Sequence, residues 1–187
     1  MAIDFGDLKK GLPVEIDGEA YEVVEYERNK MQKRAPVLRI RLRSYRTSRI
    51  MDKTISGSDI KLELASIERK NAEYIYQDGD LYYFMDISDF EQFPLTKNQI
   101  SDKLSYITEG QKVSIIFYND SPISIELSAS VELIVIEAEP GYKGNTAQGG
   151  TKPVKLETGL VINAPLFVEE NDVLKVDTRN GNYLSRV

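Results

Sequence analysis

Hydrophobic and polar residues alternate with a period of two in short runs along the whole chain. In the clearest run, Val37–Arg43, three aliphatic residues fall on one face of a predicted strand and three arginines fall on the other. Comparable β-prone runs occupy residues 11–21, 21–26, 49–55, 74–85, 112–117, 123–127, 131–137, 159–162 and 173–177. Many short strands separated by turn residues predict an all-β fold made of small barrels.

Turn residues between these runs predict tight hairpins. Asp17-Gly18 and Asp78-Gly79 each lie between two β-prone runs, which is the strongest short-range hairpin signal. The cluster Asn119–Pro122 predicts a third turn, and Asn180-Gly181 predicts a final hairpin near the end of the chain.

Helical signals are confined to the middle of the chain. Capping-box spacing occurs at Ser88–Glu91 and again at Thr96–Gln99, and Ile100 and Leu104 share one helix face. We therefore expect two short turns of helix over a barrel.

The length of 187 residues fits three small units, which we place at 1–64, 65–127 and 128–187. In the third unit, glycine-rich residues 141–151 interrupt the strands, which are expected to resume at Leu156. Gly144 and Gly149 have the offset of a phosphate-binding loop, but Gly150 stands where that motif needs its lysine. The sequence therefore argues against nucleotide binding in this segment.

Three missing residue types narrow the chemistry. The chain contains no Cys, His or Trp, so it lacks thiolate chemistry, the commonest general base and the commonest zinc ligand. No catalytic pair stands out among its 30 acidic residues. We expect a protein that is not an enzyme and has no metal or cofactor. Neither a membrane span nor a signal peptide is recognisable, which predicts a cytoplasmic location.

Charge is distributed unevenly along the chain. The formal net charge is −6, yet residues 28–51 contain nine basic residues and no acidic one. An acidic protein with one basic segment points to a negatively charged partner, of which nucleic acid is the commonest. The candidate RNA-binding residues in this segment are Arg28, Lys30, Lys33, Arg34, Arg39, Arg41 and Arg43.

Residues 27–36 are too many for a two-residue turn and predict a projecting loop. Pro36 marks the start of the following strand, so Lys33 is expected near the tip. Alternatively, Lys30, Lys33 and Arg34 only solubilise an exposed loop. The positive charge that continues along the next strand favours RNA binding over this alternative.

A cluster of aromatic residues in the second unit has two interpretations. Five aromatic residues lie within Tyr74–Phe84, and they could stack on the bases of a single strand. More commonly, such residues alternate between core and surface. A general single-stranded RNA-binding barrel would use Tyr74, Tyr76, Tyr82 and Tyr83.

The last third of the chain resembles bacterial elongation factor P. The matching segments are Pro140–Ala147, Gly149-Gly150, Lys152-Pro153, Leu156–Gly159, Pro165–Val168 and Val176–Arg186, the last of which includes Tyr183 and Arg186. The likeness extends to the other units through Gly11, Asp17-Gly18, Tyr76, Asp78-Gly79, Phe84-Met85 and the total length.

This resemblance implies a KOW-like (SH3-like) barrel followed by two OB-type barrels, in an L shape like that of tRNA. The family binds the ribosome between the peptidyl-tRNA and exit sites and relieves stalling at consecutive prolines. We expect this chain to be a monomer. The implied partners are both ribosomal subunits, ribosomal RNA and peptidyl-tRNA carrying proline. The third-unit loop that would face the small subunit contains Gly144, Asn145, Thr146, Gly149 and Gly150.

The resemblance also implies a modified residue at the tip of the first-unit loop. The family pattern Lys-Pro-Gly-Lys-Gly places Lys33 on the modifiable lysine, with Arg34 as the alternative tip residue and a lysine-modifying enzyme as a further partner. Met31, Gln32 and Arg34 replace the proline and glycines of that pattern. A paralogue of elongation factor P with a different modification remains an alternative, which Gly149-Gly150 and Val176–Arg186 disfavour.

Overall fold

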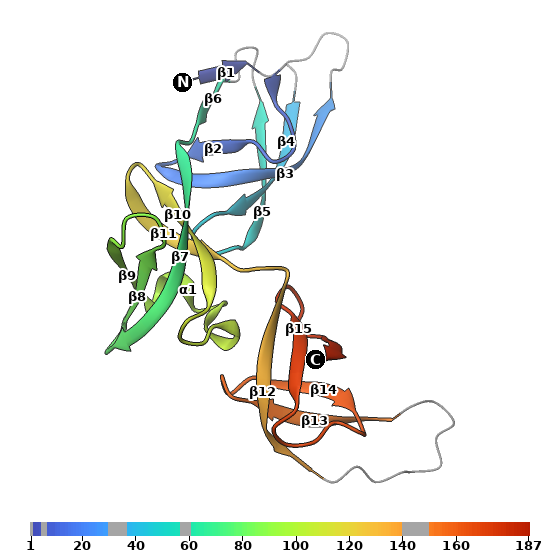
Figure 1. Cartoon of the computed structure of the whole chain (residues 1–187). Coiled ribbons are helices and arrows are strands. Elements are labelled where there is room, and N and C mark those ends of the chain that lie inside the picture. The colour runs from blue at the N-terminus through green and yellow to red at the C-terminus, as the bar shows by residue number, and fades with distance from the viewer. Residues whose placement is uncertain (1, 5–6, 30–36, 57–60, 140–149) are drawn as a thin grey trace.

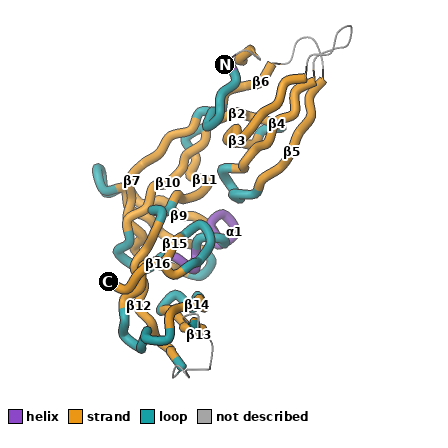
Figure 2. The backbone as a smooth tube through the Cα atoms, turned by 90° about the vertical axis from the view of Figure 1, so that its right-hand side faces the viewer, coloured by secondary structure: helices purple, strands orange, loops and turns teal. Residues whose placement is uncertain are grey.

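The computed structural model describes residues 2–4, 7–29, 37–56, 61–139 and 150–187. Within these residues, 16 strands form three antiparallel sheets that follow one another along the chain (Figure 1). The molecule is elongated and bent, with the first unit at one end and the third at the other (Figures 1 and 2). The predicted all-β fold of three successive units is confirmed.

The first unit is a six-stranded sheet in the order β1-β6-β2-β3-β4-β5. Its strands are β1 (Ala2–Asp4), β2 (Pro13–Ile16), β3 (Glu19–Asn29), β4 (Val37–Ser44), β5 (Ile50–Ser56) and β6 (Lys61–Leu64). The predicted Asp17-Gly18 turn joins β2 to β3, with φ of 55° and 79° at its two residues. The core contains Leu8, Val14, Val23, Leu38, Ile40, Leu42 and Leu62.

The long hairpin of the first unit differs in one respect from the prediction. We expected the loop to begin at residue 27, but β3 pairs with β4 as far as Asn29, which lies opposite Val37. Strand β3 therefore extends three residues beyond the predicted end. Hydropathy does not predict this extension, because Glu27, Arg28 and Asn29 are all polar. Residues 30–36 lie outside the described part of the chain.

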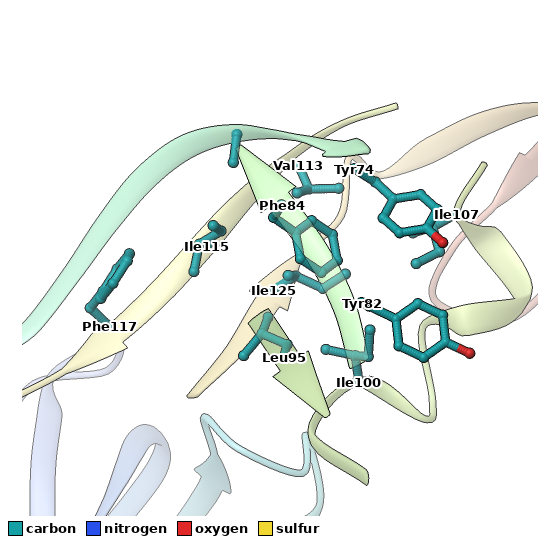
Figure 3. Packing of buried hydrophobic residues seen from close by; sticks show 11 residues of the cluster. Tyr74, Tyr82, Phe84, Leu95, Ile100, Ile107, Val113, Ile115, Phe117 and Ile125 are labelled. Atoms are coloured by element: carbon teal, nitrogen blue, oxygen red, sulfur yellow. The ribbon is translucent and has the colours of Figure 1, made fainter. Parts of the chain in front are cut away.

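The second unit is a five-stranded, curled half-barrel in the order β11-β10-β7-β8-β9, whose edge strands β9 and β11 approach each other. Its strands are β7 (Ile67–Asp78), β8 (Leu81–Asp86), β9 (Gln92–Thr96), β10 (Lys112–Tyr118) and β11 (Ser121–Glu126). Phe84, Leu95, Ile100, Ile115 and Ile125 are fully buried in its core (Figure 3).

One of the two predicted helical turns is present. Helix α1 (Lys97–Ile100) begins at a capping box in which the Thr96 amide donates to Gln99 Oε1 at 2.8 Å. The helix expected at Ser88–Glu91 is wrong: this segment is a turn, because Asp86 Oδ1 accepts from the amide and hydroxyl of Ser88 and Phe90 has φ of 62°. A short 3₁₀ helix lies instead at Leu104–Tyr106.

The third unit is a second curled half-barrel, in the order β14-β13-β12-β15-β16. Its strands are β12 (Ser130–Ala138), β13 (Thr151–Leu156), β14 (Val161–Pro165), β15 (Val173–Asp177) and β16 (Tyr183–Arg186). The expected resumption at Leu156 is wrong, because β13 already begins at Thr151. The hydropathy pattern does not predict this start, because a lysine, Lys152, occupies a position on the buried face. Its Nζ donates a hydrogen bond to the Glu139 carbonyl oxygen at 2.7 Å.

The junctions between the units are of two kinds. Between the first and second units, Ala20, Tyr45, Ala65 and Ile116 form a buried apolar cluster. Between the second and third, Tyr106 packs against the third core, and the hydroxyl of Thr158 donates to the carbonyl oxygen of Ser105 at 2.8 Å. The division at 64/65 and 127/128 stays a prediction.

Candidate nucleic-acid interface

The basic strand β4 has one buried face and one exposed face, as its alternating sequence predicts. Its burial alternates residue by residue, so that the aliphatic side chains enter the first core and Arg39, Arg41 and Arg43 point outward. The arginines are therefore available on the surface of the sheet.

Acidic side chains lie directly across the sheet from each of these arginines. In the register of the ladders, Glu22 faces Arg43, Glu25 faces Arg41 and Glu27 faces Arg39 on β3. On the other side, Asp52 of β5 also faces Arg41. Three arginines thus meet four carboxylates, so these residues give the outward face one net negative charge and not a basic character.

The ion pairs on this face are unequal. Arg41 Nε lies 2.9 Å from Asp52 Oδ1, and its second nitrogen donates to Oδ2 at 3.4 Å, so the pair is bidentate. Arg41 also lies 3.5 Å from Glu25 Oε2, whereas Arg43 has a single contact of 3.6 Å, with Glu22. Among the described residues, none forms an ion pair with Arg39.

The electrostatics of Asp52 and Arg41 follow from this contact. The hydrogen bond from Arg41 lowers the pKa of Asp52 below its ordinary value, and the same bond raises the pKa of the Arg41 guanidinium. Both groups are therefore charged at neutral pH. Between the arginines and their partners lies an open hollow of about 450 Å³, lined in part by Glu27, Arg39 and Thr54.

A β-bulge explains why the sequence alone suggests a more basic face. The β3–β4 register shifts between Val23 and Glu25, so that Glu22, Glu25 and Glu27 all lie opposite arginines. In a regular strand, Glu22 and Glu25 would point to opposite faces. The three glutamates within residues 22–27 are the sequence signal for these acidic partners. Only the bulge, however, places all three on the same face as the arginines.

Of the four remaining basic candidates for RNA binding, the structure describes one. Arg28 lies in β3 opposite Leu38, while Lys30, Lys33 and Arg34 lie outside the described residues. The last pair of this hairpin is Asn29 with Val37, where β3 ends and β4 begins. These ends of the two strands lie on the side of the first unit that is remote from the third unit (Figures 1 and 2).

The aromatic cluster of the second unit is split between core and surface. Tyr74 and Tyr82 are buried beside Phe84, as Figure 3 shows, with ring centroids 6.0 Å apart. Tyr76 and Tyr83 instead stack on each other at 4.7 Å, and Tyr76 is 40% exposed. Because two of the four tyrosines are unavailable to bases, the general single-strand-binding interpretation loses support.

Tyr183 and Arg186, at the end of the matching segment Val176–Arg186, have structural roles. Tyr183 packs against the third core, and Arg186 pairs with Asp172 at 3.4 Å while lying over the ring of Phe167. In the predicted small-subunit loop, Gly144, Asn145, Thr146 and Gly149 lie outside the described residues. Gly150 is described, and a Cβ there would lie 3.1 Å from a methyl group of Leu166.

The described part of the chain offers neither a membrane-spanning helix nor a metal-binding cluster. It contains no helix long and apolar enough to cross a membrane. Nor do its side chains form a group of three or more acidic ligands that could hold a metal ion.

Comparison with protein families gives three matches in chain order. The model described as the KOW-like domain of elongation factor P matches residues 4–60. The model of the OB domain of elongation factor P matches residues 67–125, and that of its C-terminal domain matches residues 131–186. Each of the three sheets thus falls largely within one of these matches.

Full-length relatives agree with these matches. Elongation factor P of Carboxydothermus hydrogenoformans is 43% identical over 185 residues, which is 99% of this chain and 100% of that protein. Elongation factor P of Moorella thermoacetica is 44% identical over 184 residues, covering 98% and 99% of the two chains.

A solved structure resembles part of the fold. It is described as eukaryotic translation initiation factor 5A from Methanococcus jannaschii, with a TM-score of 0.53 and 21% identity over 68% of this chain and 92% of that one. At that identity, the likeness concerns the fold alone.

Proposed function

The chain belongs to the elongation factor P family, and from this premise we propose that it binds the ribosome between the peptidyl-tRNA and exit sites and stimulates peptide-bond formation at consecutive prolines. Membership makes it a translation elongation factor. The observation that carries the proposal is the succession of three family domains over residues 4–60, 67–125 and 131–186.

The functional tip is proposed at the β3–β4 connection. Its anchors, Asn29 and Val37, are paired with each other. The ends of β3 and β4 that it joins lie at the end of the molecule that is remote from the third unit (Figure 1). A loop that starts from this end suits a protein that reaches into a crevice while its other units bind elsewhere. Lys33 is the proposed tip residue and the target of a modifying enzyme, with Arg34 as the alternative.

The proposed mechanism is positional. Translation elongation factors are not classical enzymes, and this chain has no His or Cys to act as base or nucleophile. Proline restricts the reacting chain, so a factor that holds the donor tRNA in reactive geometry accelerates the existing peptidyl-transferase centre through orientation. The tip contributes a tethered cation among RNA phosphates.

Contacts to RNA phosphates would fix the position of the factor without reading sequence. Among the strand arginines, Arg39 is the best placed, because no described carboxylate pairs with it and it lines the open hollow. The third-unit loop 144–150 is proposed to face the small subunit. The factor would act as a cytoplasmic monomer.

The test is translation in vitro of a reporter with three consecutive prolines. Lys33→Ala is expected to reduce synthesis to the level without factor, since the tip cation is lost, while circular dichroism remains that of the wild type. Arg34→Ala is the matched control and should retain most of the activity. The reverse result would assign the tip to Arg34, and full activity of both variants would overturn the proposed tip.

A further inference from the structure

Arg41 is held by two carboxylates from the strands on either side of it. Asp52 of β5 accepts two hydrogen bonds from its guanidinium, at 2.9 and 3.4 Å, and Glu25 of β3 lies at 3.5 Å. No other arginine on this face has more than one such partner among the described residues. Arg41 is nevertheless about half exposed, as is Glu25, and Asp52 is 71% exposed.

This geometry makes Asp52 a competitor for phosphate. A guanidinium binds carboxylate and phosphate with the same planar fork of donors, so a fork that is already filled by Asp52 is closed to an RNA phosphate. Exposed ion pairs are weak and are screened by salt. The Arg41–Asp52 ion pair can therefore be broken where many RNA phosphates surround Arg41. A single phosphate that passes the surface does not displace Asp52.

Asp52 also carries the surplus charge of its row. Across the sheet, Glu22 is matched by Arg43 and Glu27 by Arg39, but Arg41 faces both Glu25 and Asp52. The row through Arg41 is therefore the one with a net negative charge. An excess negative charge beside a filled fork repels RNA as well as blocking it.

We propose that Asp52 is a specificity-determining residue that holds Arg41 in a bidentate pair and so keeps the β3–β4–β5 face from binding RNA indiscriminately. This inference rests on the proposed function, because it assumes that the face meets RNA on the ribosome. Glu25 supports the pair from the opposite strand. Arg41 then contributes a phosphate contact only where the surrounding RNA displaces Asp52.

The experiment uses the full-length chain and a single-stranded RNA oligonucleotide, with binding followed by fluorescence anisotropy over a range of salt concentrations. In Asp52→Asn, the released Arg41 should add one phosphate contact. The slope of log K against log salt should then steepen by about 0.7, which corresponds to about fivefold tighter binding for each tenfold reduction in salt.

Two further variants separate this mechanism from a general charge effect. Glu170→Gln removes one negative charge from an exposed position between β14 and β15 in the third unit and should leave the slope unchanged. Asp52→Asn combined with Arg41→Ala should lose the gain. An unchanged slope in Asp52→Asn, an equal gain in Glu170→Gln, or persistence of the gain without Arg41 would each overturn the proposal.

The binding assay needs no ribosome and no translation, so its outcome is distinct from that of the reporter test. Failure of Lys33→Ala to reduce proline-dependent synthesis would count against the proposed tip while leaving the Asp52 result intact. Conversely, a negative Asp52 result would leave the proposed elongation function standing.

Discussion

Asp177 shows how one buried carboxylate depends on a single neighbour. It is 5% exposed, and its oxygens accept from Arg179 Nε at 3.0 Å, from the second guanidinium nitrogen at 2.6 Å and from the Arg179 amide at 2.9 Å. These hydrogen bonds lower the pKa of Asp177 to about 2. Arg179, 77% exposed at its side chain, thus stabilises a charge at the edge of the third unit.

This arrangement predicts a pH-dependent contribution to stability. Because the folded pKa lies below the unfolded one, the contribution is complete above about pH 4 and is lost as the pH falls toward 2. We expect Asp177→Asn to lower the free energy of unfolding at pH 7, and the gap from the wild type to narrow between pH 4 and 2. Urea unfolding at several pH values measures this gap.

Removing the partner gives an independent check of the same residue. Without the guanidinium of Arg179, Asp177 should titrate nearer its ordinary value of about 3.9. In Arg179→Ala the folded pKa approaches the unfolded one, so the variant should be less stable than the wild type at pH 7 and should lose less stability than the wild type as the pH falls from about 4 toward 2. Identical acid profiles for the two proteins would contradict the assigned cause.

At the scale of elements, the last hairpin connects the third unit to the second. The β15–β16 turn contains Gly181, whose φ is +72° and whose Cβ, if present, would lie 3.1 Å from the hydroxyl oxygen of Tyr106. Tyr106 ends the 3₁₀ helix of the second unit and packs against the third core. One position is thus constrained both by its backbone and by the neighbouring unit.

Gly181→Ala should be destabilising for both reasons. A left-handed backbone costs a non-glycine residue roughly 1–2 kcal/mol, and the methyl group must also displace Tyr106. We expect thermal unfolding to show this loss. Combining it with Tyr106→Phe should recover the steric part only, so the double variant should lie between the single Gly181→Ala variant and the wild type. Complete recovery would contradict the backbone contribution.

At the scale of the whole molecule, the first two units share a small apolar junction. Tyr45 lies in this cluster with Ala20, Ala65 and Ile116, and Arg69 lies over its ring at 5.7 Å while pairing with Glu126 at 2.9 Å. Burial raises the pKa of the Tyr45 phenol. Because Tyr45 directly follows β4 and Ala20 lies in β3, the junction packs the β3–β4 hairpin against the second unit.

Ile116→Ala should weaken this coupling. Ile116 is 5% exposed, and removing a buried isoleucine side chain typically costs 2–5 kcal/mol. We expect calorimetry to show lower stability, with the first and second units unfolding in separate transitions. Ile134→Ala, which truncates an isoleucine that is 42% exposed, is the matched control and should change stability little. Equal losses in both variants would contradict a coupling role.

The sequence predicted local structure well wherever one periodic signal dominated. The alternation of residues 37–43 predicted both the strand and its two faces, and Asp-Gly pairs predicted two hairpins that the structure confirms. Local patterns failed where a polar side chain stood on a buried face, as Lys152 does, or where a capping-like spacing served a turn, as at Ser88–Glu91. In both cases a hydrogen bond, not hydropathy, decided the outcome.

By itself, the sequence determined the all-β class, the outward direction of Arg39, Arg41 and Arg43, and the family resemblance that the comparisons confirmed. Only the tertiary structure decided the charge of that arginine face. Residues far apart in sequence, such as Arg41 and Asp52, meet through strand register, and the bulge after Val23 aligns three glutamates with the arginines. Salt screens the electrostatic potential of a charged group over short distances. The potential that a partner meets is therefore set by residues that are neighbours in space, and not by neighbours in sequence.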